Sequence, residues 1–279
     1  MNTAQRVIKY CAIAFAILLT GGIIATAVSA VMALGYVFGS WDGDDAVIST
    51  PTEVVEIGEV TEQNLTSLHI DVKATNVVIE RGAEFKLEVN EDVIKVSRGG
   101  SALYVQEKDF NFLKDWDTRG GELKIVLPEA WSSLETLRLN AGAGRVEIHD
   151  VQTRNLELDL GAGKTEVTNV KATERAKING GAGYLAVRES ELKDLDLDMG
   201  VGKVELGAKL SGNSQIDAGV GKLELNLRGS ADSYRIKVEK GLGSITFNGE
   251  KLADGAVRGE GVNLIDIDGG VGAIEVKTE

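Results

Sequence analysis

The stretch that decides the fold is LNAGAGRVEI, which occupies residues 139–148. It recurs as LDLGAGKTEV (158–167), INGGAGYLAV (178–187), LDMGVGKVEL (197–206), IDAGVGKLEL (216–225), VEKGLGSITF (238–247) and IDGGVGAIEV (267–276). The first five copies begin 19 or 20 residues apart, and the last two intervals are 22 and 29 residues. Self-similarity at a period of this size is typical of units that stack on one another.

Apolar and polar residues alternate on both sides of the two glycines. In the first copy Leu139, Val146 and Ile148 are apolar, whereas their neighbours Asn140 and Glu147 are polar. A period of two predicts strands rather than helices. Each unit is therefore expected to be a strand, a Gly-x-Gly corner, a second strand and a variable loop.

Glycine accepts bends and close backbone approaches that a residue with a Cβ does not. Repeated at one position, such corners predict an all-β fold, a single-stack β-solenoid (β-helix-like) with rungs of about 19–20 residues. The expected structural corner glycines are Gly142, Gly144, Gly161, Gly163, Gly181, Gly183, Gly200, Gly202, Gly219, Gly221, Gly241, Gly243, Gly270 and Gly272.

The repeat is expected to begin earlier in a degenerate form. Residues 71–79 match residues 140–148 position by position but lack the glycines, so we interpret them as a first rung. The solenoid is predicted over 67–279, with an irregular cap and first rung in 67–138 and regular repeats in 139–279. The cap contains Phe110, Phe112 and Trp116, which either cover the end of the core or form a contact patch for a partner.

The N-terminus carries the second clear signal. Residues 10–41 contain no charged residue, and about 20 apolar residues suffice for a transmembrane helix. Arg6 and Lys9 precede this run and acidic residues follow it, which predicts a cytoplasmic tail in 1–9 and a single-pass anchor with the C-terminal domain extracytoplasmic. Residues 42–66 are predicted to be an acidic linker. The competing interpretation is a signal peptide cleaved after Ala27.

Composition limits the partners. The formal net charge is −13, and because Arg6 and Lys9 are the only charged residues before residue 42, residues 42–279 carry −15. Such a polyanionic domain is poorly suited to nucleic acid. We expect membrane lipid around the N-terminal helix and an unidentified protein or cell-envelope ligand as partners. A homo-oligomer is a further option, because Gly35 and Gly39 form a Gly-x-x-x-Gly pair.

The sequence predicts no catalytic residue and no cofactor. The chain has two histidines, His69 and His149, and neither stands in a recognisable catalytic motif. No Gly-x-Gly triplet extends to the Gly-x-Gly-x-x-Gly of a dinucleotide site, and no Cys/His cluster offers zinc ligands. A carbohydrate-active β-helix enzyme remains an alternative, although such enzymes need a long groove and this chain is 5% aromatic.

One polar column lies two residues before the triplets. It comprises Asp71, Asn140, Asp159, Asn179, Asp198, Asp217, Glu239 and Asp268, and alternation points it outward. Carboxylates one rung apart repel, and Asn140 and Asn179 on either side of Asp159 are expected to relieve this repulsion. Lys203 and Lys222 are expected to offset Asp198, Asp217 and Glu239. The column is interpreted either as a solvated polar ladder or as a weak metal site at Asp198 and Asp217.

The run in 140–148 and its copies resemble the bacterial putative-adhesin family, a domain of unknown function whose members often follow a single membrane anchor. The resemblance covers about residues 67–279. It implies a membrane-anchored cell-surface protein that is not an enzyme and that binds or scaffolds in an adhesin-like way. Relatives also resemble accessory proteins of envelope-stress signalling, so a sensor or regulator of that response is the alternative function.

Overall fold

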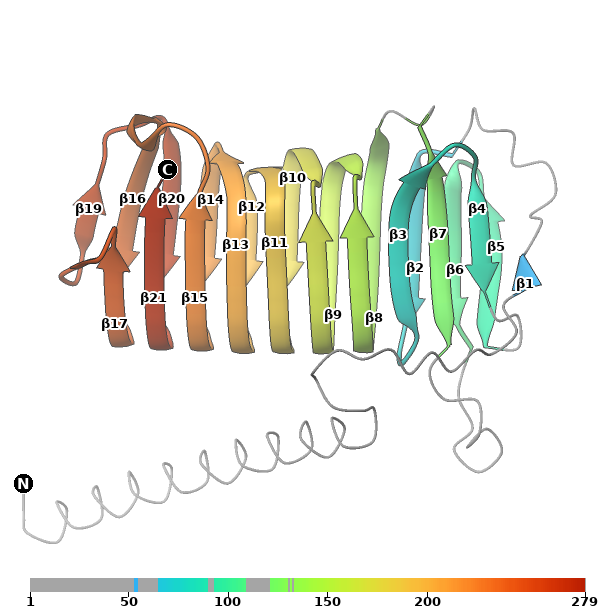
Figure 1. Ribbon diagram of the computed structural model, residues 1–279, viewed down its shortest axis with the longest axis horizontal. Helices are drawn as coiled ribbons and strands as arrows, with labels where there is room; N and C mark the ends of the chain where they lie inside the picture. The colour runs from blue at the N-terminus through green and yellow to red at the C-terminus, as the bar shows by residue number, and fades with distance from the viewer. Residues whose placement is uncertain are drawn as a thin grey trace, which may run out of the picture. The chain divides into compact units, whose positions relative to one another are not determined.

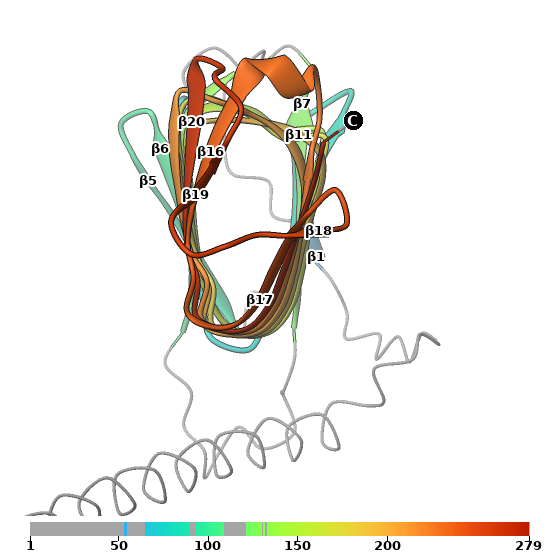
Figure 2. The same ribbon diagram turned by 90° about the vertical axis from the view of Figure 1, so that its left-hand side faces the viewer.

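The computed structural model describes residues 53–54, 65–89, 93–108, 121–129, 131 and 133–278. Within these residues the chain is all-β, apart from a 3₁₀ helix at Ala231–Ser233. The strands lie side by side along one direction (Figure 1) and form two walls that converge toward one narrow edge (Figure 2). This confirms the predicted β-solenoid.

We call the wall that each repeat enters first the entry wall. Its parallel strands are, in spatial order, β6 (Ala102–Glu107), β2 (Ser67–Val72), the first part of β8 (Leu134–His149), the first part of β9 (Gln152–Thr168), β10 (Lys171–Asn179), β12 (Leu195–Asp198), β14 (Asn213–Asp217), β20 (Asn263–Asp268) and β16 (Tyr234–Glu239).

The chain then crosses a corner into the exit wall. Its parallel strands are β7 (Glu122–Pro128), β3 (Asn76–Gly82), the second parts of β8 and β9, β11 (Ala182–Lys193), β13 (Val201–Ser211), β15 (Val220–Leu227), β21 (Val271–Thr278) and β17 (Leu242–Phe247).

Short antiparallel strands close both ends of the stack. At one end β5 (Ile94–Gly99) pairs with β6, β4 (Lys86–Val89) pairs with β7, and β1 (Glu53–Val54) pairs with β4. At the other end β19 (Ala256–Arg258) pairs with β16, and β18 (Glu250–Lys251) pairs with β17. They cover parallel edges that would otherwise offer unpaired backbone groups to other chains.

The order of the rungs in space differs from their order in the sequence at both ends. The degenerate rung pairs with the first regular one as expected, with Asp71 opposite Asn140, but β6 and β7 stack outside it. At the C-terminus β20 and β21 insert between the rungs of β14–β15 and β16–β17, so the last two rungs stack out of sequence order. The longer insertion in 248–262 gives the chain the length to turn back and fill that space.

The core consists of columns of aliphatic side chains. The column three residues before the triplets is at most 1% exposed, and contains Leu139, Leu158, Ile178, Leu197, Ile216, Ile267 and Val238. Burying one such side chain contributes roughly 1.5–3 kcal/mol. A single rung leaves both of its sides open to water, so burial requires neighbours on both sides.

Close packing of the rungs explains the glycines. The N–H of Val201, in the middle of its triplet, donates to the Gly181 carbonyl of the preceding rung at 2.8 Å, and Val220 donates to Gly200 in the same way at 2.9 Å. A Cβ built on Gly200 would overlap that same Gly181 oxygen, well inside 3.0 Å. The second glycine of the triplet, Gly202, also has a φ of +142°, which side-chain-bearing residues rarely adopt.

A carboxylate closes the corner of the degenerate rung. Glu107 on β6 accepts hydrogen bonds from the N–H groups of Lys73, Ala74 and Thr75 at 2.7, 2.9 and 3.2 Å, and from the Thr75 hydroxyl at 3.0 Å. Elsewhere the carbonyl of a neighbouring corner accepts the equivalent bond. Glu107 therefore satisfies backbone groups at a place where the glycine pattern is missing.

No helix among the described residues is long and apolar enough to cross a bilayer. The predicted anchor in 10–41 lies outside those residues, as do Phe110, Phe112 and Trp116.

The corner geometry yields a matched pair of substitutions on β13. Gly202→Ala should lower the free energy of unfolding by about 2–5 kcal/mol, because it adds backbone strain to an overlap with the neighbouring corner. Gly207→Ala should be nearly neutral, because its Cβ would lie 3.5 Å from the closest atom. Urea unfolding monitored by far-ultraviolet circular dichroism measures both. Equal losses would contradict the close-approach explanation.

Candidate functional site

Polar side chains of the exit wall form two columns that run across the rungs. Directly after the corners stand Arg145, Lys164, Tyr184, Lys203 and Lys222. Two residues further along come Glu147, Glu166, Ala186, Glu205, Glu224 and Glu275, which the strand register places side by side. We call these two columns, with Arg188, the charge ladder.

Ion pairs form within and between the rungs of the ladder. Lys164 lies 3.0 Å from Glu166, Lys203 lies 2.6 Å from Glu205, and Lys222 pairs with Glu224. Lys203 also reaches Glu224 on the next rung at 3.4 Å. At the N-terminal side Arg145 and His149 lie 3.5 and 3.6 Å from Glu147. The face is therefore flat and nearly neutral, although the domain as a whole is strongly acidic.

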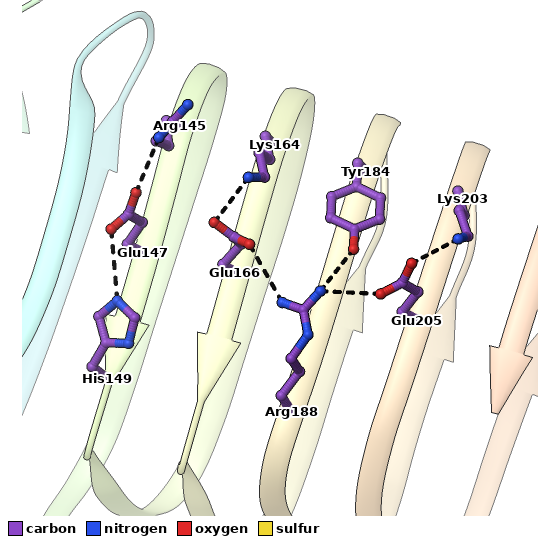
Figure 3. Close-up of polar contacts among 9 residues, drawn as sticks. All are labelled: Arg145, Glu147, His149, Lys164, Glu166, Tyr184, Arg188, Lys203 and Glu205. Carbon is purple, nitrogen blue, oxygen red and sulfur yellow. Dashed lines mark hydrogen bonds and ion pairs between the residues drawn. The ribbon is translucent and has the colours of Figure 1, made fainter. Parts of the chain in front are cut away.

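One rung breaks the pattern, because Tyr184 stands where other rungs carry a cation (Figure 3) and Ala186 replaces the usual glutamate. Arg188, two residues further along β11, fills the gap: it lies 3.3 Å from Glu166 and 3.1 Å from Glu205, on the two neighbouring rungs. Its guanidinium also donates to the Tyr184 hydroxyl at 2.9 Å. One cation thus joins three strands, and Ala186 beneath is fully buried.

These contacts shift the pKa values of the ladder. Hydrogen bonds from Lys203 and Tyr184 lower the pKa of Glu205 below its ordinary 4.5, despite partial burial. Burial acts to raise the pKa of Glu166, but the contacts with Lys164 and Arg188 outweigh it and the pKa is lowered. Burial and hydrogen bonding to Glu205 raise the pKa of the Tyr184 phenol, so it stays protonated at neutral pH.

The directions of these shifts fix the pH range of the ladder. A carboxylate with a lowered folded pKa contributes stability above its unfolded pKa, and this is lost as pH falls through the folded value. The pKa of Lys203 is raised from 10.5 by its hydrogen bond to Glu205, so its contribution is present below 10.5 and lost above. The ladder is therefore complete between mildly acidic and mildly alkaline pH.

The sequence interpretation of the two lysines is wrong. Lys203 and Lys222 do not offset Asp198 and Asp217; they pair with glutamates of the exit wall. The sequence did contain a signal for this pairing. In each of these strands a lysine stands two residues before a glutamate, and this spacing places both side chains on one face of the strand. The role of Arg188 had no such signal, because it depends on contacts across two rungs.

The predicted polar column lies on the outer side of the entry wall, before the corners. Asn179 donates to Asp159, as expected, whereas Asn140 donates to Asp71 on its other side at 3.2 Å. Asp198 and Asp217 occupy neighbouring rungs in register. In the described part of the chain, no group of three or more His, Cys, Asp or Glu side chains is arranged to hold a metal ion.

Two small cavities among the described residues lie at the corners that form the narrow edge. Their volumes are about 40 and 10 Å³, and glycines and aliphatic side chains supply most of the lining. The larger one adjoins Gly180, where no side chain separates Leu160 from Met199 on the neighbouring rungs. Such a space holds at most a water molecule or two.

Comparison with known proteins identifies relatives of the fold. The Toastrack DUF4097 family model matches residues 65–260. A putative adhesin from Bacteroides fragilis NCTC 9343 is 14% identical with a TM-score of 0.50, and the match covers 84% of this chain and 99% of that one. A putative cell adhesion protein from Clostridium sporogenes ATCC 15579 is 16% identical with a TM-score of 0.34, covering 82% and 98%. No curated protein matches the chain.

Replacing Arg188 should weaken the ladder in a pH-dependent way. Arg188→Met keeps the aliphatic stem over Ala186 and removes the charge, so we expect a loss of roughly 1 kcal/mol at pH 7. The loss should shrink at a strongly acidic pH below the lowered folded pKa values of Glu166 and Glu205, where both carboxylates are protonated. Thermal unfolding at both pH values measures it, with Lys171→Met as control because Lys171 reaches one exposed glutamate, Glu191. A loss independent of pH would contradict an ionic role.

Proposed function

Since the chain belongs to the Toastrack DUF4097 family, we propose that it is a membrane-anchored bacterial surface protein that acts by binding or scaffolding, without catalysis. The observation that carries this proposal is the flat, periodic outer face of each wall. Side chains repeat there at the spacing of the strands, about 4.8 Å, and pair with one another along the columns. Such a face suits an extended contact with another surface.

The interior of the solenoid supports a non-catalytic role. Ligand pockets usually measure about 300–1,000 Å³, whereas the two cavities described above have volumes of about 40 and 10 Å³. The lowered pKa values of Glu166 and Glu205 arise from ion pairs that keep both groups ionised, which suits a structural ladder better than proton transfer.

The charge pattern of the N-terminus supports the anchored location. Residues 10–41 are uncharged, with Arg6 and Lys9 on one side and Asp42, Asp44 and Asp45 on the other. Such an asymmetry favours a cytoplasmic N-terminus and an extracytoplasmic solenoid. Adhesion is our preferred kind of binding because the Bacteroides fragilis protein that shares the fold is described as a putative adhesin.

Cysteine labelling tests the proposed topology. Cys11 is the only cysteine, so a Cys11→Ser background allows one new thiol at a time. We expect Val262→Cys, whose position is 90% exposed, to react with a membrane-impermeant maleimide on intact spheroplasts. Thr3→Cys, in the expected cytoplasmic tail, should react only after lysis. Protection of Val262→Cys until lysis would place the solenoid in the cytoplasm and overturn the anchored orientation.

Binding without turnover is the second expectation. The full chain in detergent can be screened against glycans, peptidoglycan fragments and esterase substrates. We expect Asp198→Asn with Asp217→Asn to weaken any binding through the entry wall and to leave the unfolding midpoint nearly unchanged. Turnover that a single carboxylate substitution abolishes would make the protein an enzyme. A pull-down from intact membranes that recovers only an integral membrane protein would favour envelope-stress signalling over adhesion.

A further inference from the structure

The exposed apolar side chains of the solenoid gather along one edge. The described residues contain seven large hydrophobic side chains classed as exposed, and four of them are the middle residues of successive corners. These are Val201, Val220, Val271 and Leu242, which are 44, 37, 49 and 77% exposed. The strand register places them next to one another in that order. We call these four residues the apolar ridge.

The ridge is not required by the corner itself. The same position holds Ala143, Ala162 and Ala182 in the preceding rungs, in register with Val201. The backbone hydrogen bond that joins the corners uses only the N–H of this residue, so any side chain other than proline is compatible with it. Three steps of about 4.8 Å give a continuous apolar stripe roughly 14 Å long. Glycines on either side leave it uncovered.

Opposite charges border the ridge. On the entry-wall side lie Asp198, Asp217, Asp268 and Glu239, three residues before the ridge residue of each rung. On the exit-wall side lie Lys203 and Lys222, two residues after it, each also paired with a glutamate of the charge ladder. Ala273 and Ser244 hold this position in the other two rungs. The acidic side is electrostatically strained: burial and the nearby Glu239, Asp266 and Asp217 raise the pKa of Asp268. A partner that brings positive charge to this side and negative charge to the other would relieve it.

A second copy of this chain has that charge distribution in one orientation only. If two ridges meet about a two-fold axis parallel to the stacking direction, Asp198 and Asp217 of each copy face Lys203 and Lys222 of the other. In the remaining two rungs Asp268 and Glu239 face Ala273 and Ser244. If the two-fold axis is instead perpendicular to the stacking direction and the ridges stay in contact, the acidic border of one copy faces the acidic border of the other. Anionic lipid is disfavoured by the acidic border.

We propose that the apolar ridge is a self-association surface at which two copies of this chain meet in parallel. Four side chains are fewer than a standard interface of about 800 Å² per partner needs, so the contact is weak between free molecules. Two chains anchored in one membrane meet at a high effective concentration, and parallel packing gives their stacks the same polarity. This strengthening, but not the contact itself, rests on the proposed anchor.

Disulfide cross-linking of the full chain in its membrane tests the contact and its direction. In a Cys11→Ser background, Val201→Cys, Val220→Cys and Val271→Cys should each form a dimer under mild oxidation, several-fold more than Val262→Cys, which lies off the ridge. Each position meets itself in a parallel pair. In an antiparallel pair at most one position does so, and Val201→Cys would instead link to Leu242→Cys. That pattern, or yields equal to the control, would overturn the proposal.

Two further variants separate the ridge from other causes. The triple change Val201→Thr, Val220→Thr and Val271→Thr keeps β-branched side chains of similar size, so the fold should persist while the sedimentation-velocity dimer fraction falls. Val257→Thr, at a position 43% exposed on β19, is the matched control. If the triple variant instead lost binding to neutral lipid vesicles with its dimer fraction unchanged, the ridge would be a lipid contact. Because purified protein is used, at concentrations high enough to populate a weak dimer, a wrong anchor would not affect this result.

Reversing the charges that border the ridge provides the decisive test of the parallel arrangement. Asp217→Lys alone and Lys222→Glu alone should both dimerise less, because each places like charges opposite one another in a parallel pair. A mixture of the two variants should recover dimers, because both facing pairs at this rung are then of opposite sign. Failure of the mixture to recover, with both variants folded by circular dichroism, would refute the parallel arrangement.

Discussion

The corner-to-corner hydrogen bond is the constraint on which the rest of the solenoid depends. The N–H of the middle residue donates to the first glycine carbonyl one rung away, for example from Val271 to Gly219 at 2.8 Å. This bond pulls successive backbones so close that a Cβ at either glycine would overlap the neighbouring rung. Glycine is therefore needed at two positions in every regular rung, and this requirement produces the repeat in the sequence.

The same constraint creates a problem at the ends of the stack, where a corner lacks a neighbour. The structure solves it in two ways. At the N-terminal end the Glu107 carboxylate replaces the missing carbonyls, and β4 and β5 turn antiparallel against the outermost rung. At the C-terminal end the chain adds β18 and β19 first and then returns, so that its last two strands are paired on both sides. Strands paired on both sides are better protected from fraying than the strands of a terminal rung.

The sequence predicts the core well and the surface less well, for a physical reason. Alternation and glycine spacing are local features, so the rungs, their inner columns and the register of 71–79 on 140–148 follow from them. The order of the last two rungs does not, because residues 267–276 fit either place with the same pattern. Arg188 could not be assigned either, since its role arises from the absence of a glutamate at Ala186 and from carboxylates on two other strands. The pairing of Lys203 with Glu205 could have been found, because both lie on one face of one strand.

Regularity also determines where specificity can lie. Every outward column is repeated along the stack, so a partner that contacts only the repeated side chains would bind at any rung. Individual rungs become distinguishable where the sequence departs from the repeat. Tyr184 and Arg188 interrupt the charge ladder, and the middle residue of the corner changes from alanine to valine and leucine along the stack. The core tolerates both departures because their side chains point away from it. A repeat protein of this type can therefore change its contacts one rung at a time without losing the hydrogen-bonded corners that hold it together.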